Sequence, residues 1–505
     1  MQNEQNFSTE EERAWGPTQR GFEPEEGAFP EPGGFPNPNA FPEPGGFPNP
    51  NAFPEPGGFP DPNAFPEVDG VLGAKRSRIR GGKFGGANKN WGPDAQALRW
   101  QDYVWFFLLF FSLVEPFCDI SRFPIKSVLC VLTALLAFGC VAMCRFSASF
   151  ERAKIGWAAL LVYFIGSAFV ANTLDTTYTV INMVVLLAFT VKPSVSATYI
   201  LQRWLVALGV VLTASCVLHA VAPSVLYRVG GIFANAEWLE VANRWASHDV
   251  YSGLTNQTGT TAILIVLGIV ALLCSMERSK SPARCYGLLG LMALGVILTG
   301  KRAMFILAVF SALYYWNATG SRKKKVFTTI VLVLGSFAYL AFSGGGPDLS
   351  EVKVYERFAG TNVGAGGYYS NRDVLFRAAW ATGAENPIFG VGWGKFAQTS
   401  GLDMGAHNVY LQIWAECGLV GLVPFLALTL GTFFYTRQRL KIVDGVEKKL
   451  LLFSFINQAV FLLYSFTGNP WYTMSTRNVY LFACMIALTA STFEPRRRDE
   501  GRMVA

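Results

Sequence analysis

The sequence predicts an all-α polytopic membrane protein with about twelve transmembrane helices, preceded by a disordered N-terminal tail. Apolar stretches recur from residue 100 onward, each near the roughly 20 residues that cross a hydrocarbon core. Only 15% of the 505 residues are charged, whereas soluble domains contain roughly a quarter. The Lys and Arg residues gather in alternate connections between the apolar stretches, as the positive-inside rule requires of cytoplasmic loops. The net charge of +7 therefore indicates a membrane partner and no nucleic acid.

Residues 1–99 differ in composition from the rest of the chain. The segment EPGGFPNPNAFP occurs at 31–42 and 43–54, and again at 55–66 with Asp61 in place of Asn. Because proline lacks a backbone donor and glycine resists ordering, we expect a disordered cytoplasmic tail. Its recurrent Phe residues offer a motif for an unknown cytoplasmic partner, and a plain linker is the alternative. A basic patch at 75–83 precedes the first span.

The transmembrane domain is predicted to cover residues 100–495. Its apolar stretches lie at 102–117, 125–144, 155–172, 175–191, 198–220, 258–276, 286–300, 302–318, 326–343, 418–436, 449–467 and 477–493. Alternation from a cytoplasmic N-terminus puts most Lys- and Arg-rich connections, and the tail at 496–505, in the cytoplasm. Two long extracytoplasmic loops follow from this topology, at 221–257 and at 344–417, the latter between the ninth and tenth spans. We expect an interfacial helix in the first loop.

Two cations occupy a tight extracytoplasmic turn in LTGKRAMF, namely Lys301 and Arg302. They break the positive-inside pattern, and a charge held near hydrocarbon is costly unless it has a partner. Both are therefore candidates for binding an anion. The alternative is that they extend to lipid head groups.

Arg372 lies in the first turn of a helix that Pro387 ends. A cation at this position opposes the helix dipole, and an anion that binds there would explain it. An ordinary surface arginine is the other interpretation. Arg357 and Arg377 are further candidates nearby.

His407 opens the next helix, HNVYLQIWAECG. The positive end of the helix dipole favours its neutral imidazole, which suits a general base. The alternative for a lone histidine is a capping or core role. Asn408 is predicted to cap or position this helix. Glu416 is a candidate orienting carboxylate, and the alternative is that a backbone or arginine partner satisfies it.

The glycines Gly390, Gly392 and Gly394 in GVGWG predict a turn with positive φ rather than a nucleotide loop, because no βαβ unit surrounds them. The chain has no zinc-type His/Cys spacing, no paired aspartates of D-x-D form and no P-loop. The sequence therefore predicts no metal and no cofactor. The cysteines fall mostly within apolar stretches, where they behave as small hydrophobic residues.

The segments NRDVLFRAAW, NPIFGVGWGKF and HNVYLQIWAECGLVGL, with the LTGKR turn, resemble the O-antigen ligase / Wzy-type O-antigen (exopolysaccharide) polymerase superfamily. This resemblance implies a GT-C-like membrane glycosyltransferase of the bacterial inner membrane that uses an undecaprenyl-diphosphate-linked glycan donor. Arg302 and Arg372 are then expected to hold the diphosphate, and His407 to deprotonate the acceptor hydroxyl. The family implies inversion without a metal. Lys301 stands where a serine is common.

The resemblance further assigns substrate contacts to Lys301, Arg357, Arg377, Gly390, Gly392, Asn408 and Glu416. The acceptor is a glycan or lipid A-core, and a third relative transfers glycan to protein. The sequence does not separate these activities. A transporter or flippase of lipid-linked oligosaccharide is the alternative from another class, and it predicts ionisable residues at mid-membrane, broken helices and a pseudo-symmetric pair of halves.

Overall fold

The computed structural model describes residues 100–143, 152–279, 281–320, 372–402 and 404–489. All of them belong to one structural unit, Gly82–Ala505. The predicted N-terminal tail, the predicted span at 326–343, Arg357 and the tail at 496–505 lie outside the described residues.

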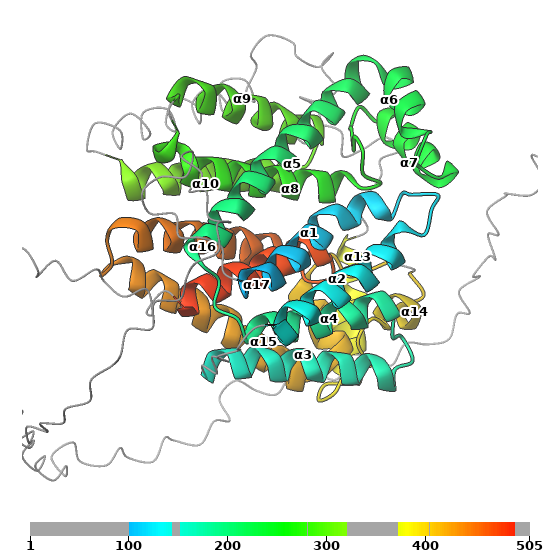
Figure 1. Cartoon of the computed structure of the whole chain (residues 1–505). Coiled ribbons are helices and arrows are strands. Elements are labelled where there is room, and N and C mark those ends of the chain that lie inside the picture. The colour runs from blue at the N-terminus through cyan, green and yellow to red at the C-terminus, as the bar shows by residue number, and fades with distance from the viewer. Residues whose placement is uncertain (1–99, 144–151, 280, 321–371, 403, 490–505) are drawn as a thin grey trace, which may run out of the picture. The chain divides into compact units, whose positions relative to one another are not determined.

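Helices are the regular elements throughout the described part of the chain, which contains one isolated β-bridge between Ser121 and Ala234. Figure 1 shows their arrangement. The α-helices are α1 (Asp102–Cys118), α2 (Ile125–Met143), α3 (Arg152–Val170), α4 (Thr176–Phe189), α5 (Val195–Val221), α6 (Pro223–Gly230), α7 (Ala236–Ala246), α8 (Thr258–Ser275), α9 (Pro282–Leu298), α10 (Arg302–Thr319), α13 (Arg372–Glu385), α14 (Phe396–Ser400), α15 (Val409–Leu440), α16 (Gly445–Tyr464) and α17 (Met474–Thr489).

Each predicted apolar stretch within the described residues falls on a helix. Five helical segments are long and apolar enough to cross a membrane: Ile125–Ala142, Arg152–Val170, Val195–Val221, Thr258–Arg278 and Val409–Leu440. Two shorter apolar helices are α4 and α9. The prediction of an all-α membrane protein is therefore confirmed, while the number of about twelve spans remains a prediction.

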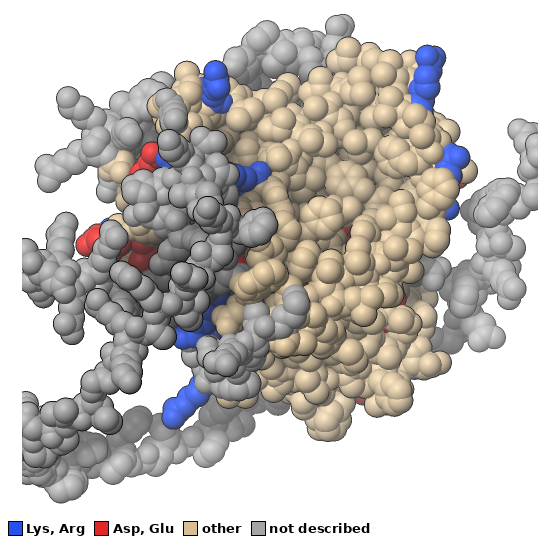
Figure 2. Space-filling view, in the orientation of Figure 1, with Lys and Arg blue, Asp and Glu red and all other residues tan. Residues whose placement is uncertain are grey.

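Alternate connections between the helices meet at one end of the bundle, which we call the loop end. Hydrogen bonds join these connections in pairs: Asn235 with Ile120, Tyr251 with Leu298, Thr173 with Trp393, and Val409 with Ser465. Among the described residues, the α4–α5, α8–α9 and α15–α16 connections lie at the opposite end, where Lys449 pairs with Glu277 at 2.9 Å. Figure 2 shows a broad face almost free of charged side chains, with Lys and Arg side chains at its right edge and charged side chains of both signs at its left. That distribution suits a bundle that crosses a bilayer.

The segment 221–257 folds into α6 and α7 at the loop end. Asn235 caps α7, since its side chain accepts a hydrogen bond from the Trp238 N–H at 2.8 Å. Trp238 and Ala242 are buried, whereas most of the helix faces outward. The expected helix in this loop is confirmed, and its position at a membrane interface remains a prediction.

Candidate functional site

The longest helix of the family-like stretch is broken in the middle. Gly418 of α15 has φ 59° and ψ −162°, so the backbone stops being helical there and resumes at the next residue. Such a break frees backbone donors and acceptors that are costly to leave unpaired inside a membrane protein.

Segment 387–392 takes up these freed groups. The N–H groups of Val391 and Gly392 donate to the carbonyls of Ala415 and Glu416 at 3.0 and 2.7 Å. In return, the N–H groups of Leu419 and Val420 donate to the carbonyls of Pro387 and Ile388 at 2.8 and 3.1 Å. The segment NPIFGVG (386–392) therefore completes the hydrogen bonding of the broken helix, and we call this segment the inserted loop.

Glycine is required on both sides of this contact. Gly390 and Gly418 have φ values of 69° and 59°, in the left-handed region that costs other residues about 1–2 kcal/mol. A Cβ on Gly390 would overlap the backbone of Glu416, and one on Gly418 would overlap the Ile388 carbonyl. Gly392 and Gly394 also have positive φ, so the predicted turn geometry is confirmed.

Trp393 fixes the inserted loop to the membrane helices. Its ring stacks on Phe164 of α3 and on Tyr472, with centroid distances of 4.4 and 4.6 Å. The backbone N–H of Trp393 donates to Ser167 Oγ at 3.1 Å, and its backbone carbonyl accepts from Thr173 Oγ1. The loop therefore rests on α3 and on the α16–α17 connection.

Glu416 is buried in this assembly, with 1% of its surface exposed. Oε2 accepts from the Gly394 N–H at 2.9 Å and from the Tyr472 hydroxyl at 2.7 Å. Oε1 accepts from Gln412 Nε2 at 3.1 Å and from the Phe396 N–H at 3.4 Å. Both oxygens of the carboxyl group thus accept hydrogen bonds from the protein itself. This geometry does not support the expectation that Glu416 contacts substrate.

The start of α15 fixes the backbone around His407. Asn408 is the cap: its Oδ1 accepts from the N–H groups of Tyr410 and Leu411 at 3.0 and 3.1 Å, as the sequence predicted. His407 itself has φ 52°, a left-handed conformation in which histidine is enriched but which still costs about 1–2 kcal/mol. The surrounding hydrogen bonds hold this conformation.

Three groups from distant parts of the sequence act on one another at the loop end. The pKa of His407 lies below its ordinary value because the ring is partly desolvated and because Arg372 and Lys301 are close enough to repel its proton. Arg372 begins α13, as expected, and Lys301 directly precedes α10. A neutral imidazole beside two cations is an arrangement that binds an anion and accepts a proton.

The cluster of Lys301, Arg372 and His407 and the inserted loop both lie within a segment that matches a protein-family model. Residues 287–426 match the family model described as O-antigen ligase. These residues are similar to the O-antigen ligase family. The resemblance predicted from the motifs is thereby confirmed. No curated protein matches the sequence.

Within residues 287–426, the LTGKR turn contributes Lys301 as the cation that acts on His407. The Lys301 Nζ lies 5.5 Å from the ring centroid of Trp245 in α7, a distance at which a cation is attracted to an aromatic face. Helix α7 therefore reaches the candidate site from the first loop. Arg302 is the first residue of α10, and its side chain is exposed. Its predicted role in binding diphosphate remains a prediction.

The other predicted arginines do not join this cluster in the described residues. Arg377 pairs with Asp373 at 2.8 Å on a face of α13 where both side chains are mostly exposed. That ion pair lowers the pKa of Asp373. Arg357 lies outside the residues that the structure describes.

The sequence did not predict several residues that contact or lie near the candidate site. Tyr464, at the end of α16, lies within electrostatic range of Arg372. Trp245 covers Lys301, and Tyr472 and Gln412 hold Glu416. No local pattern marks these residues, because each acquires its role from a partner on another element or one helical turn away.

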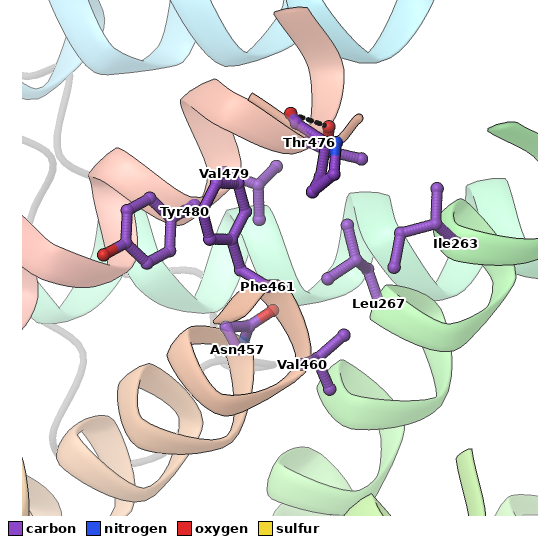
Figure 3. A pocket seen from close by; sticks show the side chains of 9 residues that line it. Ile263, Leu267, Asn457, Val460, Phe461, Thr476, Val479 and Tyr480 are labelled. Atoms are coloured by element: carbon purple, nitrogen blue, oxygen red, sulfur yellow. Dashed lines mark hydrogen bonds between the residues drawn. The ribbon is translucent and has the colours of Figure 1, made fainter. Parts of the chain in front are cut away.

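A small cavity lies elsewhere, between α8, α16 and α17 (Figure 3). Most of its lining is apolar, and the polar side chains in it are those of Asn457, Thr476 and Tyr480. Its volume of ≈ 10 Å³ leaves room for about one water molecule, so it is too small for a sugar. Among the described residues, no cluster of three or more His, Cys, Asp or Glu side chains is placed to hold a metal ion.

Proposed function

We propose that the chain is a membrane glycosyltransferase that moves an undecaprenyl-diphosphate-linked glycan onto an acceptor hydroxyl. The observation that carries this proposal is that Arg372 and Lys301 both lower the pKa of His407 by charge repulsion, within the residues that match the O-antigen ligase family model. The three groups come from three separate segments, and the fold brings them to one end of the bundle. Structural stability alone gives no reason to gather two cations beside an imidazole.

In this proposal the cations hold the donor. Arg372 and Lys301, with Arg302 one residue further along, bind the diphosphate oxygens and stabilise the charge that develops when the glycosidic bond breaks. Guanidinium groups bind phosphate through paired N–H donors, and lysine adds a compact charge. Positive side chains therefore take the part that a metal takes in many nucleotide-sugar enzymes.

His407 is then the base. Its lowered pKa keeps the imidazole neutral at pH 7, so that it is free to take the proton of the acceptor hydroxyl. The hydroxyl oxygen attacks the anomeric carbon opposite the departing diphosphate, which inverts the configuration. Binding of the anionic donor offsets the repulsion from Arg372 and Lys301. The base therefore becomes stronger once the donor is in place.

The loop end faces outward in this proposal. The connections at the opposite end include α15–α16, where Arg437, Arg439 and Lys441 lie close together in the sequence. The positive-inside rule assigns such connections to the cytoplasm, together with both termini. The site then lies at the extracytoplasmic face of the bacterial inner membrane, where lipid-linked glycans are delivered.

The experiment is a transfer assay with the purified full-length protein in lipid vesicles. Lipid-linked repeat units are supplied alone, with lipid A-core, or with an acceptor protein. A ladder from the donor alone indicates a polymerase, a single shift of the core indicates a ligase, and a shift of the protein indicates a protein glycosyltransferase. If no product forms while the donor crosses the vesicle membrane, a flippase replaces the proposal.

A further inference from the structure

We propose that Gln412 is a positioning residue that holds His407 at the site, through a hydrogen-bonded relay running from Glu416 through Gln412 to Ala406. This inference rests on the proposed function, because it assigns Gln412 a purpose in the same reaction. Gln412 does not join the cluster of charges itself. It acts on the backbone that carries the base.

Both ends of the Gln412 amide are engaged. Its Oε1 accepts from the N–H of Ala406 at 3.0 Å, one residue before His407. Its Nε2 donates to Glu416 Oε1 at 3.1 Å, one helical turn further along α15. A primary amide carries a donor and an acceptor at the same end of a side chain, so glutamine is suited to link these two groups.

The direction of the amide is set by Ala406. A backbone N–H only donates hydrogen bonds, so the Gln412 oxygen must face Ala406 and its NH₂ group then faces Glu416. Glu416 is in turn held by the Gly394 N–H at 2.9 Å and by the Tyr472 hydroxyl at 2.7 Å. Burial raises the pKa of Tyr472 well above its ordinary value, so its hydroxyl remains a donor. Gly394, just after the inserted loop, and Tyr472 of the α16–α17 connection thus hold Glu416, the first residue of the relay.

His407 lies between two restrained neighbours. Ala406 is fully buried and tied to Gln412, while Asn408 caps α15 and also donates to the Phe466 carbonyl at 3.4 Å. Gly405 passes so close to Gln412 and Asn469 that a Cβ there would overlap both. The left-handed conformation of His407 is therefore set by its neighbours, and the Ala406–Gln412 hydrogen bond is the restraint on its N-terminal side.

The test is Gln412→Met, which keeps the length of the side chain and removes both hydrogen bonds. Gln438→Met is the matched control, since Gln438 is an exposed glutamine near the other end of α15. Two quantities are measured on the full chain in vesicles: kcat and KM of glycan transfer, and the pH profile of His407 modification by diethyl pyrocarbonate, followed by peptide mass spectrometry. His219 and His248 serve as internal references.

Gln412→Met is expected to lower kcat by about 10- to 100-fold with little change in KM, because a base displaced by about 1 Å loses that much. The pH profile of His407 modification should also move toward that of an ordinary histidine, while the profiles of His219 and His248 stay unchanged. Gln438→Met should behave as wild type. A Gln412→Met protein with wild-type kcat and an unshifted His407 profile overturns the proposal.

Two further results keep the outcomes separate. If Gln412→Met does not accumulate in the membrane, Tyr472→Phe removes one donor from Glu416, and it should shift the His407 profile in the same direction by less. An unshifted profile in Tyr472→Phe then counts against the relay. If His407→Ala retains transfer, the proposed role of His407 as base fails, while the modification profile still decides whether Gln412 positions it.

Discussion

Gly418→Ala tests whether the break in α15 and the inserted loop are one unit. The substitution has two effects at this position. An alanine with φ near 59° costs about 1–2 kcal/mol. Its Cβ would also overlap the Ile388 carbonyl, so segment 387–392 must move away from α15.

The size of the second effect follows from the hydrogen bonds at the break. Four backbone hydrogen bonds join the inserted loop to residues 415–420. At about 1 kcal/mol each, their loss adds about 4 kcal/mol, and more where the freed groups meet lipid rather than water. The expected destabilisation is about 5–6 kcal/mol in total, which is a large part of the stability of a typical domain.

Two other glycines separate the two effects. Gly401 has φ 66° with nothing within 4 Å of an added Cβ, so Gly401→Ala should lose only the backbone cost of about 1–2 kcal/mol. Gly431 lies in α15, also with nothing within 4 Å of an added Cβ. Gly431→Ala should be neutral, or stabilising by up to about 1 kcal/mol.

The assay is thermal unfolding of the three variants in detergent, followed by tryptophan fluorescence and by the fraction that stays soluble after heating. Gly418→Ala should unfold at a much lower temperature than Gly401→Ala, with Gly431→Ala at or above wild type. Equal melting temperatures for Gly418→Ala and Gly401→Ala would refute the insertion of the loop into the helix. Retained transfer in Gly418→Ala would show in addition that the break is dispensable for activity.

The remaining predictions concern the site and the tail. His407→Ala and Arg302→Ala should each abolish glycan transfer at near-normal membrane levels in immunoblots, and full activity in both would favour the transporter. Lys301→Met should raise the pKa of His407, because one of the two repelling cations is gone. Since the base works when neutral, the acid limb of the kcat–pH profile should move to higher pH. An acid limb at the wild-type pH would contradict the assigned repulsion between Lys301 and His407. Deletion of residues 1–70 should leave kcat unchanged in vesicles, and a loss of turnover would show that the tail takes part in the reaction.

Much of the fold follows from the sequence because its determinants are local. The length and apolar character of a stretch predict a membrane helix without knowledge of its neighbours, so helices such as α5 and α8 lie where the sequence placed them. The same holds for the asparagine cap at Asn408 and for the glycines with positive φ, since a capping side chain or a missing Cβ acts within a few residues.

The sequence predicted which residues belong to the candidate site but not which of them contact one another. The sequence singled out both Lys301 and Arg302 and favoured Arg302 for the catalytic role. A charge pattern does not indicate which of two adjacent side chains lies nearer to His407. That choice depends on the rotation of α10 against its neighbours, and the structure assigns the electrostatic contact with His407 to Lys301. Glu416 was expected to meet substrate, but whether a carboxylate is free or occupied depends on donors from distant segments such as Tyr472.

The sequence by itself determined that this chain is a helical membrane protein with an O-antigen ligase motif, because hydrophobic length and short-range turn chemistry suffice for that. Only the tertiary structure decided that NPIFGVG completes the broken helix at Gly418, and that Gln412 ties Glu416 to the backbone before His407. The physical reason is that hydrogen bonds and charge contacts depend on distances in space. Segments far apart in the chain come within such distances only when the whole bundle packs.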